Sequence, residues 1–155
     1  MPGLQIRKIR AEDVDAALGI LAQWNMAPIA PSSSCPDPER SELSAENTFV
    51  ALAGNRVVGV ASYILLGPKQ AETASLAVAP DWRGKGVGEC LQRARLAELK
   101  KRGIRYVRTE TDRPETVEWY VKKFGYRLAG TSPKKHPFSL ENVQWWTVLE
   151  LDLGD

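Results

Sequence analysis

The fold of this chain is decided by one stretch of its sequence, Leu76-Ala77-Val78-Ala79-Pro80-Asp81-Trp82-Arg83-Gly84-Lys85-Gly86-Val87-Gly88. Apolar residues typical of a strand lead to a proline, and three glycines at alternate positions follow just before a helical pattern. Backbone N–H groups at the start of a helix attract anions, and glycine lets a ligand approach the backbone closely. Since Arg83 and Lys85 add positive charge, the stretch predicts a phosphate-binding site.

Two other phosphate motifs do not fit the same glycines. A dinucleotide fingerprint needs Gly-x-Gly-x-x-Gly, but counting from Gly84 places Glu89 at the third glycine. Counting from Gly86 instead places Leu91 there. A Walker A loop needs a glycine five residues before its Gly-Lys pair, where this chain has Ala79. The remaining interpretations are another kind of phosphate loop and a glycine-rich turn without a ligand.

Strand and helix patterns alternate along the whole chain, which is typical of an α/β or α+β sheet covered by helices. The Gly54-Asn55 pair predicts a two-residue hairpin turn in which both residues tolerate positive φ. Asp112 to Glu115 combines a capping-box spacing with an early proline, which predicts a helix start. The expected strands cover 5–10, 48–53, 56–65, 72–78, 104–111, 126–129 and 144–153, and the expected helices cover 11–24, 39–44, 86–103 and 112–124.

Length and composition exclude several classes of protein. The chain has 155 residues, of which 43% are hydrophobic and 26% charged, and we expect one soluble domain spanning 1–155. No apolar run approaches the roughly 20 residues of a membrane span, and the N-terminus lacks a secretory pattern, so we expect a cytoplasmic protein. A net charge of +2 does not predict nucleic-acid binding. The two cysteines form neither a disulfide framework nor a metal-binding spacing.

The glycine stretch resembles motif A of the GCN5-related N-acetyltransferase (GNAT) family, whose (Arg/Gln)-x-x-Gly-x-(Gly/Ala) core is matched at Arg83, Gly86 and Gly88. The segment from Glu118 to Tyr126 resembles motif B of the same family. The resemblance implies a mixed, mostly antiparallel sheet of six or seven strands flanked by about four helices. It also implies direct transfer of an acetyl group from acetyl-coenzyme A to a primary amine, without a metal.

The resemblance further implies which groups hold coenzyme A. The backbone from Leu76 to Val78 would pair with the pantetheine arm, and the N–H groups from Gly84 to Glu89 would bind the pyrophosphate. Side chains after the fifth strand would touch the adenine end. The cofactor-binding residues are then Leu76, Ala77, Val78, Arg83, Gly84, Lys85, Gly86, Val87, Gly88, Glu89, Arg113, Thr116 and Lys123.

Two side chains are candidates for proton transfer. An amine with a pKa of about 10.4 must lose a proton before it attacks a thioester. Glu72 lies four residues before Leu76 on the same strand face, so it is the candidate base; the alternative is an exposed carboxylate at a strand end. The resemblance assigns Tyr120 as the acid that protonates the departing thiolate, and its apolar neighbours leave a core role open.

The acceptor is a small-molecule or protein amine whose identity stays open. By the same resemblance, Trp24 and the loop over 28–38 lie where acceptor-binding elements stand, so we expect Trp24 to contact the substrate. His136, the one histidine, lies in a basic loop over 132–138 that we expect to be exposed, and it contacts substrate or solvent in this interpretation. The default assembly is a homodimer. Two alternatives are a coenzyme A-binding sensor or interaction domain without catalysis, and an acyltransferase that uses a longer acyl-coenzyme A.

Overall fold

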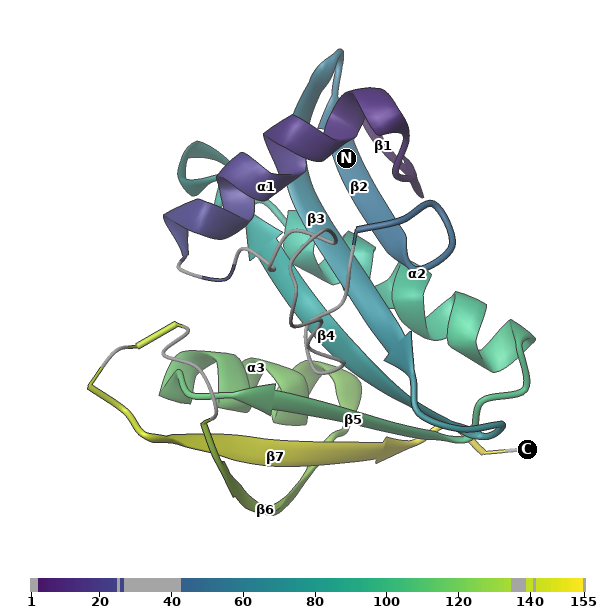
Figure 1. Ribbon diagram of the computed structural model, residues 1–155, viewed down its shortest axis with the longest axis vertical. Coiled ribbons are helices and arrows are strands. Elements are labelled where there is room, and N and C mark those ends of the chain that lie inside the picture. Colours follow the sequence, from purple (N-terminus) through teal and green to yellow (C-terminus); the bar gives the residue numbers. More distant parts are fainter. Residues whose placement is uncertain (1–2, 25, 27–42, 135–138, 141, 155) are drawn as a thin grey trace, which may run out of the picture. The chain divides into compact units, whose positions relative to one another are not determined.

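The structure, a computed structural model, describes residues 3–24, 26, 43–134, 139–140 and 142–154 (Figure 1). Seven strands form one sheet in the order β1-β2-β3-β4-β5-β7-β6. The elements are β1 (Leu4–Lys8), a 3₁₀ turn (Ala11–Asp13), α1 (Val14–Gln23), β2 (Thr48–Ala53), β3 (Arg56–Leu65), β4 (Gln70–Val78), a 3₁₀ turn (Pro80–Trp82), α2 (Val87–Lys101), β5 (Tyr106–Thr111), α3 (Pro114–Phe124), β6 (Arg127–Pro133) and β7 (Trp145–Asp152).

The chain divides into two compact units. The first comprises Met1–Ile64 and Thr73–Glu98, and the second comprises Leu65–Glu72 and Leu99–Asp155. The expected mixed, mostly antiparallel sheet is confirmed, with three α-helices in the described part of the chain. Of the helix expected over 39–44, only Leu43 and Ser44 are described, and neither is helical. None of the helices within the described ranges has the length and hydrophobicity that a membrane span requires.

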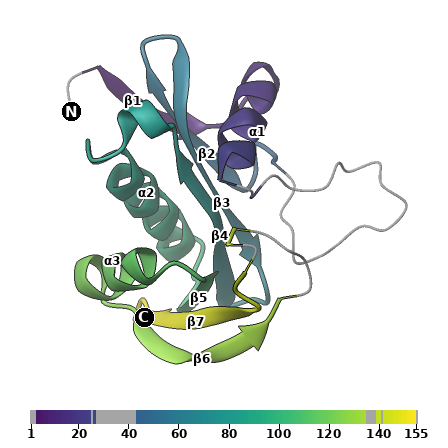
Figure 2. The same ribbon diagram turned by 90° about the vertical axis from the view of Figure 1, so that its left-hand side faces the viewer.

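In the first unit, β1, β2 and β3 form an antiparallel ladder. The hairpin expected over 48–53 and 56–65 is confirmed, although only Gly54 of its two turn residues takes a positive φ, 62°. Figure 2 shows α1 on one face of β2 and β3 and α2 on the other. Because both faces are covered, these strands carry continuous apolar runs rather than alternating ones, and Val50 and Val60 are fully buried.

The buried face of α2 includes a charged residue. Leu91 and Leu99 are fully buried as part of an i, i+4 stripe, and Arg95 belongs to the same stripe and is 0% exposed. Two apolar residues lie outside this stripe, since Cys90 is half-buried and Ala97 is exposed. Apolar spacing alone does not indicate this stripe, because arginine is almost never fully buried unless it is paired.

The second unit contains both parallel and antiparallel pairing. Gln70 to Glu72 of β4 pair in parallel with Tyr106 to Arg108 of β5. β7 pairs antiparallel with both β5 and β6. Figures 1 and 2 show α3 along one face of β5 and β7. Gly125 ends α3 with a φ of 75°, a left-handed conformation that glycine adopts readily.

The start of α3 corrects two expectations. Pro114 is its first residue as predicted, but the preceding Arg113 makes no side-chain capping bond, so the capping box is wrong. Asp112 is instead buried, accepting hydrogen bonds from Lys134 Nζ at 2.6 Å and from the Leu140 N–H at 2.9 Å. The Lys134 side chain is only 4% exposed, although the 132–138 loop was expected to be exposed. Asp112 draws this lysine inward, and β6 continues to Pro133 instead of ending at 129.

Candidate coenzyme A site

The glycine segment forms the turn between β4 and α2 in the first unit. Gly84 and Gly86 have φ values of 75° and 85°, which residues with a Cβ rarely adopt. The N–H of Cys90 donates to the Gly86 carbonyl at 3.1 Å, which is the first hydrogen bond of the helix. N–H groups ahead of such a bond have no carbonyl partner within the helix and carry its positive dipole. The segment therefore presents donors to an anion.

Space beside these two glycines is open. A Cβ added at Gly84 or Gly86 would meet no atom within 4 Å. Gly59 on β3 shows the opposite case, because a Cβ there would lie 2.8 Å from Leu91. Internal packing thus explains the glycine at 59 but not those at 84 and 86. The glycine segment has the shape that lets a ligand approach the backbone.

Positive charge dominates around the glycine segment. The Arg83 guanidinium lies 4.9 Å from the centre of the Trp24 ring, and the Lys85 ammonium lies 4.8 Å from that of Trp82. The nearby carboxylate of Asp81 is paired with Arg56 through contacts of 2.7 and 2.9 Å. The hydrogen bond from Arg56 lowers the pKa of Asp81, which keeps this carboxylate ionised and paired. The two remaining cations suit a polyanion such as a pyrophosphate.

Trp24 joins the end of α1 to the end of β4. Its indole Nε1 donates a hydrogen bond of 2.9 Å to the Val78 carbonyl, while Arg83 stacks on its ring. The structure therefore brings together three residues that were predicted separately for substrate and cofactor binding. Within β4, Ala77 is buried, whereas Leu76 and Val78 are half-buried and belong to the opposite strand face.

Glu72 lies in the second unit, opposite Arg108 in the parallel pair of β4 and β5. Its carboxylate Oε1 is 3.3 Å from Arg108 Nε, and its side chain is 18% exposed. Arg108 also contacts Glu110 at 2.5 Å. Glu72 is therefore half-buried and ion-paired rather than freely exposed, and its assignment as the base stays a prediction. Sequence reasoning missed Arg108, since no local signal reveals which residue of a parallel neighbour stands opposite.

Tyr120 is 3% exposed and belongs to an aromatic cluster formed by α3 and Tyr126, the second residue after the helix. Its ring centre lies 5.0 Å from that of Trp119 and 4.9 Å from that of Tyr126. Trp119 packs in turn on Phe124 at 4.9 Å. These edge-on and tilted contacts pack the tyrosine ring between two other aromatic rings. The cluster is compatible with core packing and also with a fixed hydroxyl, so the assignment of Tyr120 as acid stays a prediction.

The other predicted cofactor contacts lie beside or on α3. Arg113 and Thr116 stand at the first turn of the helix, both half-buried, and Lys123 is exposed in its last turn. The loop over 28–38 and His136 fall outside the described residues. Within the described ranges, no group of three or more histidine, cysteine or acidic residues could hold a metal ion.

Comparison with known proteins gives a consistent family assignment. The family model described as "Acetyltransferase (GNAT) family" matches residues 18–126, which include the glycine segment and α3. None of the curated proteins matches this chain. The fold is similar to that of Ard1 from Thermoplasma volcanium, with a TM-score of 0.76, 20% identity and 99% of each chain covered.

Two further solved structures share the fold. The ribosomal-protein-S18-alanine N-acetyltransferase from Escherichia coli has a TM-score of 0.72 at 18% identity, over 98% of this chain and 95% of that one. N-acetylglutamate synthase from Neisseria gonorrhoeae, complexed with coenzyme A and N-acetyl-glutamate, has a TM-score of 0.73 at 19% identity. That match covers 98% of this chain and 35% of the synthase. Identities this low establish the fold alone, whereas the family model spans most of the sequence. The chain belongs to the acetyltransferase (GNAT) family.

Proposed function

We propose that this protein is an N-acetyltransferase that transfers an acetyl group from acetyl-coenzyme A directly to a primary amine. The observation that carries the proposal is the glycine segment, in which two left-handed glycines open onto free space at the start of α2. Arg83 and Lys85 add the charge that a pyrophosphate requires. The family assignment supports the same activity.

Acetyl-coenzyme A would supply an activated thioester, and the chain's own residues would hold it. The N–H groups from Gly84 to Glu89 bind the pyrophosphate, and the backbone from Leu76 to Val78 pairs with the pantetheine arm. Trp24 flanks the acceptor, because its indole is fixed at the Val78 end of β4. Arg113, Thr116 and Lys123 are the proposed contacts toward the adenine end.

The proposed reaction needs two proton transfers. The amine nitrogen forms a bond to the thioester carbonyl carbon, and the bond from that carbon to sulfur breaks. Glu72, directly or through a water, takes the proton that the amine loses, and Arg108 forms an ion pair with its carboxylate at 3.3 Å. Tyr120 gives its phenolic proton to the departing thiolate. Its packing against Trp119 and Tyr126 supports a defined position for the ring that carries this hydroxyl.

The experiment that tests the activity is thiol release from acetyl-coenzyme A with a panel of amines. We expect turnover with at least one small amine or peptide N-terminus. Glu72→Gln and Tyr120→Phe should each lower kcat by about a hundredfold, the usual contribution of a positioned acid or base. Glu110→Gln is the control for Glu72, because Glu110 also pairs with Arg108. Tyr106→Phe, on a tyrosine that is 47% exposed, is the control for Tyr120.

The outcomes separate the proposal from its alternatives. Binding of coenzyme A without thiol release from any amine would identify a coenzyme A-binding sensor or interaction domain. Faster turnover with a longer acyl-coenzyme A than with acetyl-coenzyme A would show that the enzyme transfers the longer acyl group. Unchanged kcat in both variants would show that Glu72 and Tyr120 were wrongly assigned, while the activity itself would stand. We further propose a cytoplasmic homodimer, which sedimentation and cell fractionation would test.

A further inference from the structure

A fully buried arginine on α2 has no part in the chemistry proposed above. Arg95 and its neighbour Gln92 are both 0% exposed. Arginine is almost never buried in full unless its donors are used, because a charge without partners is costly in a protein interior. Packing alone does not explain an arginine here, because burying a leucine at the same position would cost less desolvation free energy.

The guanidinium of Arg95 bridges two neighbouring strands. Its Nη1 donates hydrogen bonds of 2.9 Å to the Ser62 carbonyl on β3 and of 2.9 Å to the Ser75 carbonyl on β4. Nη1 carries two N–H groups, so each carbonyl receives one of them. Nε donates to Gln92 Oε1 at 3.0 Å, and Nη2 contacts the same oxygen, which fixes the rotation of the guanidinium plane.

A second polar contact joins β3 and β4 where Arg95 binds them. Along β4 the buried positions alternate, with Ala71, Thr73 and Ala77 buried, and Ser75 on the same face is half-buried. The Ser75 N–H donates to the Ser62 side-chain oxygen at 3.3 Å. The two strands are therefore joined at this point by the Arg95 guanidinium, through both backbone carbonyls, and by the contact between the two serines.

The Arg95 contact with Ser75 immediately precedes the proposed thioester-binding segment. Ser75 is followed by Leu76 to Val78, whose backbone groups are proposed to pair with the pantetheine arm. After Val78, the strand is fixed again by the hydrogen bond of 2.8 Å from the Ala79 N–H to the Val58 carbonyl. The segment therefore lies between two anchors, and Arg95 provides the first of them.

We propose that Arg95 is a positioning residue for acetyl transfer, which holds β4 at Ser75 so that the backbone of Leu76 to Val78 faces the thioester. The proposal rests on the proposed function. A displacement of about 1 Å in such a segment can cost roughly a hundredfold in rate, whereas the pyrophosphate contacts at the glycine segment would be unaffected. Because the Ser75 carbonyl accepts a bond from a cation, the peptide that continues to Leu76 is also polarised, which strengthens its N–H as a donor.

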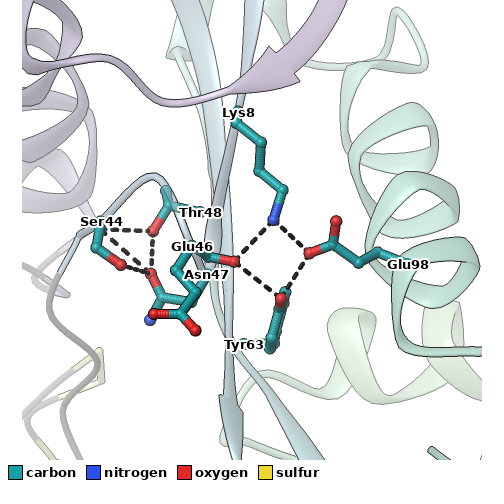
Figure 3. Close-up of polar contacts among 7 residues, drawn as sticks. All are labelled: Lys8, Ser44, Glu46, Asn47, Thr48, Tyr63 and Glu98. Carbon is teal, nitrogen blue, oxygen red and sulfur yellow. Dashed lines mark hydrogen bonds and ion pairs between the residues drawn. The ribbon is translucent and has the colours of Figure 1, made fainter. Parts of the chain in front are cut away.

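A second polar network on α2 supplies the matched control. The hydroxyl of Tyr63 on β3 lies 2.5 Å from Glu98 Oε2 and 2.9 Å from the Glu46 carbonyl, and Lys8 contacts the same two groups (Figure 3). This network also ties α2 to β3 through a buried side chain, since Tyr63 is 1% exposed. The partners of Tyr63 drawn in Figure 3 are Glu98 on α2 and Glu46 just before β2. Tyr63→Phe therefore weakens a contact between α2 and β3 and keeps the side chain of Arg95 and the carbonyls of Ser62 and Ser75 that it binds.

The test compares Arg95→Met, Arg95→Lys, Ser62→Ala and Tyr63→Phe. We expect Arg95→Met to lower kcat by about tenfold or more while the Kd for coenzyme A stays within about threefold. Arg95→Lys should recover part of kcat, because an ammonium keeps the charge and two donors. Ser62→Ala should lower kcat by a smaller factor. Tyr63→Phe should lower the melting temperature and leave kcat within about twofold.

Hydrogen exchange gives a readout that is independent of turnover. Arg95→Met should speed amide exchange in 74–78 and leave that in 84–90 unchanged, and Tyr63→Phe should change neither. If Arg95→Met does not fold, Arg95→Lys and Ser62→Ala test the proposal in its place. Wild-type kcat together with wild-type amide hydrogen exchange in both of these variants would overturn the proposal. If the wild-type protein turns over no amine, the proposed function is overturned instead. The amide hydrogen exchange of residues 74–78 in the Arg95 variants would then be the only test of whether Arg95 positions β4.

Discussion

The indole nitrogen of Trp24 donates a 2.9 Å hydrogen bond to the carbonyl of Val78, residues that stand 54 positions apart in the sequence. This bond attaches the end of α1 to the point where β4 gives way to the glycine segment. The Arg83 guanidinium lies over the same indole ring. The Trp24 side chain thus connects the end of α1, which we expect to contact the acceptor, with β4, which we expect to bind the thioester.

Trp24→Phe should weaken acceptor use and slightly destabilise the fold. The change removes the N–H that Val78 accepts, which costs about 1 kcal/mol of unfolding free energy, and it loosens the ring under Arg83. We expect a several-fold loss in kcat/KM for the amine, measured at saturating acetyl-coenzyme A. Trp145→Phe is the control, because Trp145 is 55% exposed at the start of β7. Equal kcat/KM in the two variants would remove Trp24 from the acceptor site.

Gly86→Val should abolish tight binding of coenzyme A. Valine at a φ of 85° is strained, and its side chain would fill the space into which a pyrophosphate must come. We expect the Kd, measured by calorimetric titration, to rise by more than about tenfold. Gly54→Val is the matched control, because Gly54 has a φ of 62° and similarly open surroundings in the β2–β3 turn. Retained affinity in Gly86→Val would refute the proposed pyrophosphate site.

Lys134→Met should destabilise the second unit strongly. Its ammonium lies 2.6 Å from Asp112 Oδ2 and 4.5 Å from the centre of the Trp146 ring, so removing it leaves a buried carboxylate without its counter-ion. Breaking a buried pair in this way costs about 3–5 kcal/mol, measured by urea unfolding. Lys134→Met combined with Asp112→Asn should lose less than Lys134→Met alone. A double variant as unstable as the sum of the single ones would show that the two side chains do not interact.

Stability should fall in acid as two buried carboxylates take up protons. A hydrogen bond from Arg7 lowers the pKa of Asp13 below its ordinary value of 3.8. Burial raises the pKa of Asp112, but hydrogen bonds from Lys134, Leu140 and Ser139 outweigh it and leave the pKa below 3.8. The native state therefore binds fewer protons than the unfolded chain. The stabilisation is complete above the unfolded pKa and is lost as pH falls through the lower native values.

Urea unfolding at a series of pH values checks this expectation. Wild-type stability should be flat near neutral pH and decline below about pH 4. Asp13→Asn should show lower stability at neutral pH and a shallower decline in acid, because one of the two linked protons is gone. A decline in Asp13→Asn as steep as that of the wild-type protein would show that Asp13 does not contribute to the acid sensitivity.

Local sequence patterns predicted the fold and the glycine turn between β4 and α2. The hairpin at Gly54, the start of α3 at Pro114 and its end at Gly125 each follow from residues that restrict φ at a single position. The glycine segment follows from neighbours within a few positions of Gly84 and Gly86. These features depend on backbone conformations that a short segment can specify on its own, so they could be read without knowing what packs against them.

Charged residues placed in the interior could be recognised only in the tertiary structure. Arg95 looks like a solvent-facing helix residue, Asp112 looks like a helix cap, and Lys134 looks like part of an exposed basic loop. Each is buried because a partner 20 or more positions away satisfies it: the Ser75 carbonyl for Arg95, and Asp112 and Lys134 for each other. The free energy of burying a charge is set by those distant partners, which a local pattern does not contain. The sequence by itself thus determined the strand–glycine–helix segment and the family, and only the tertiary structure decided which charges hold β4 and α3 in place.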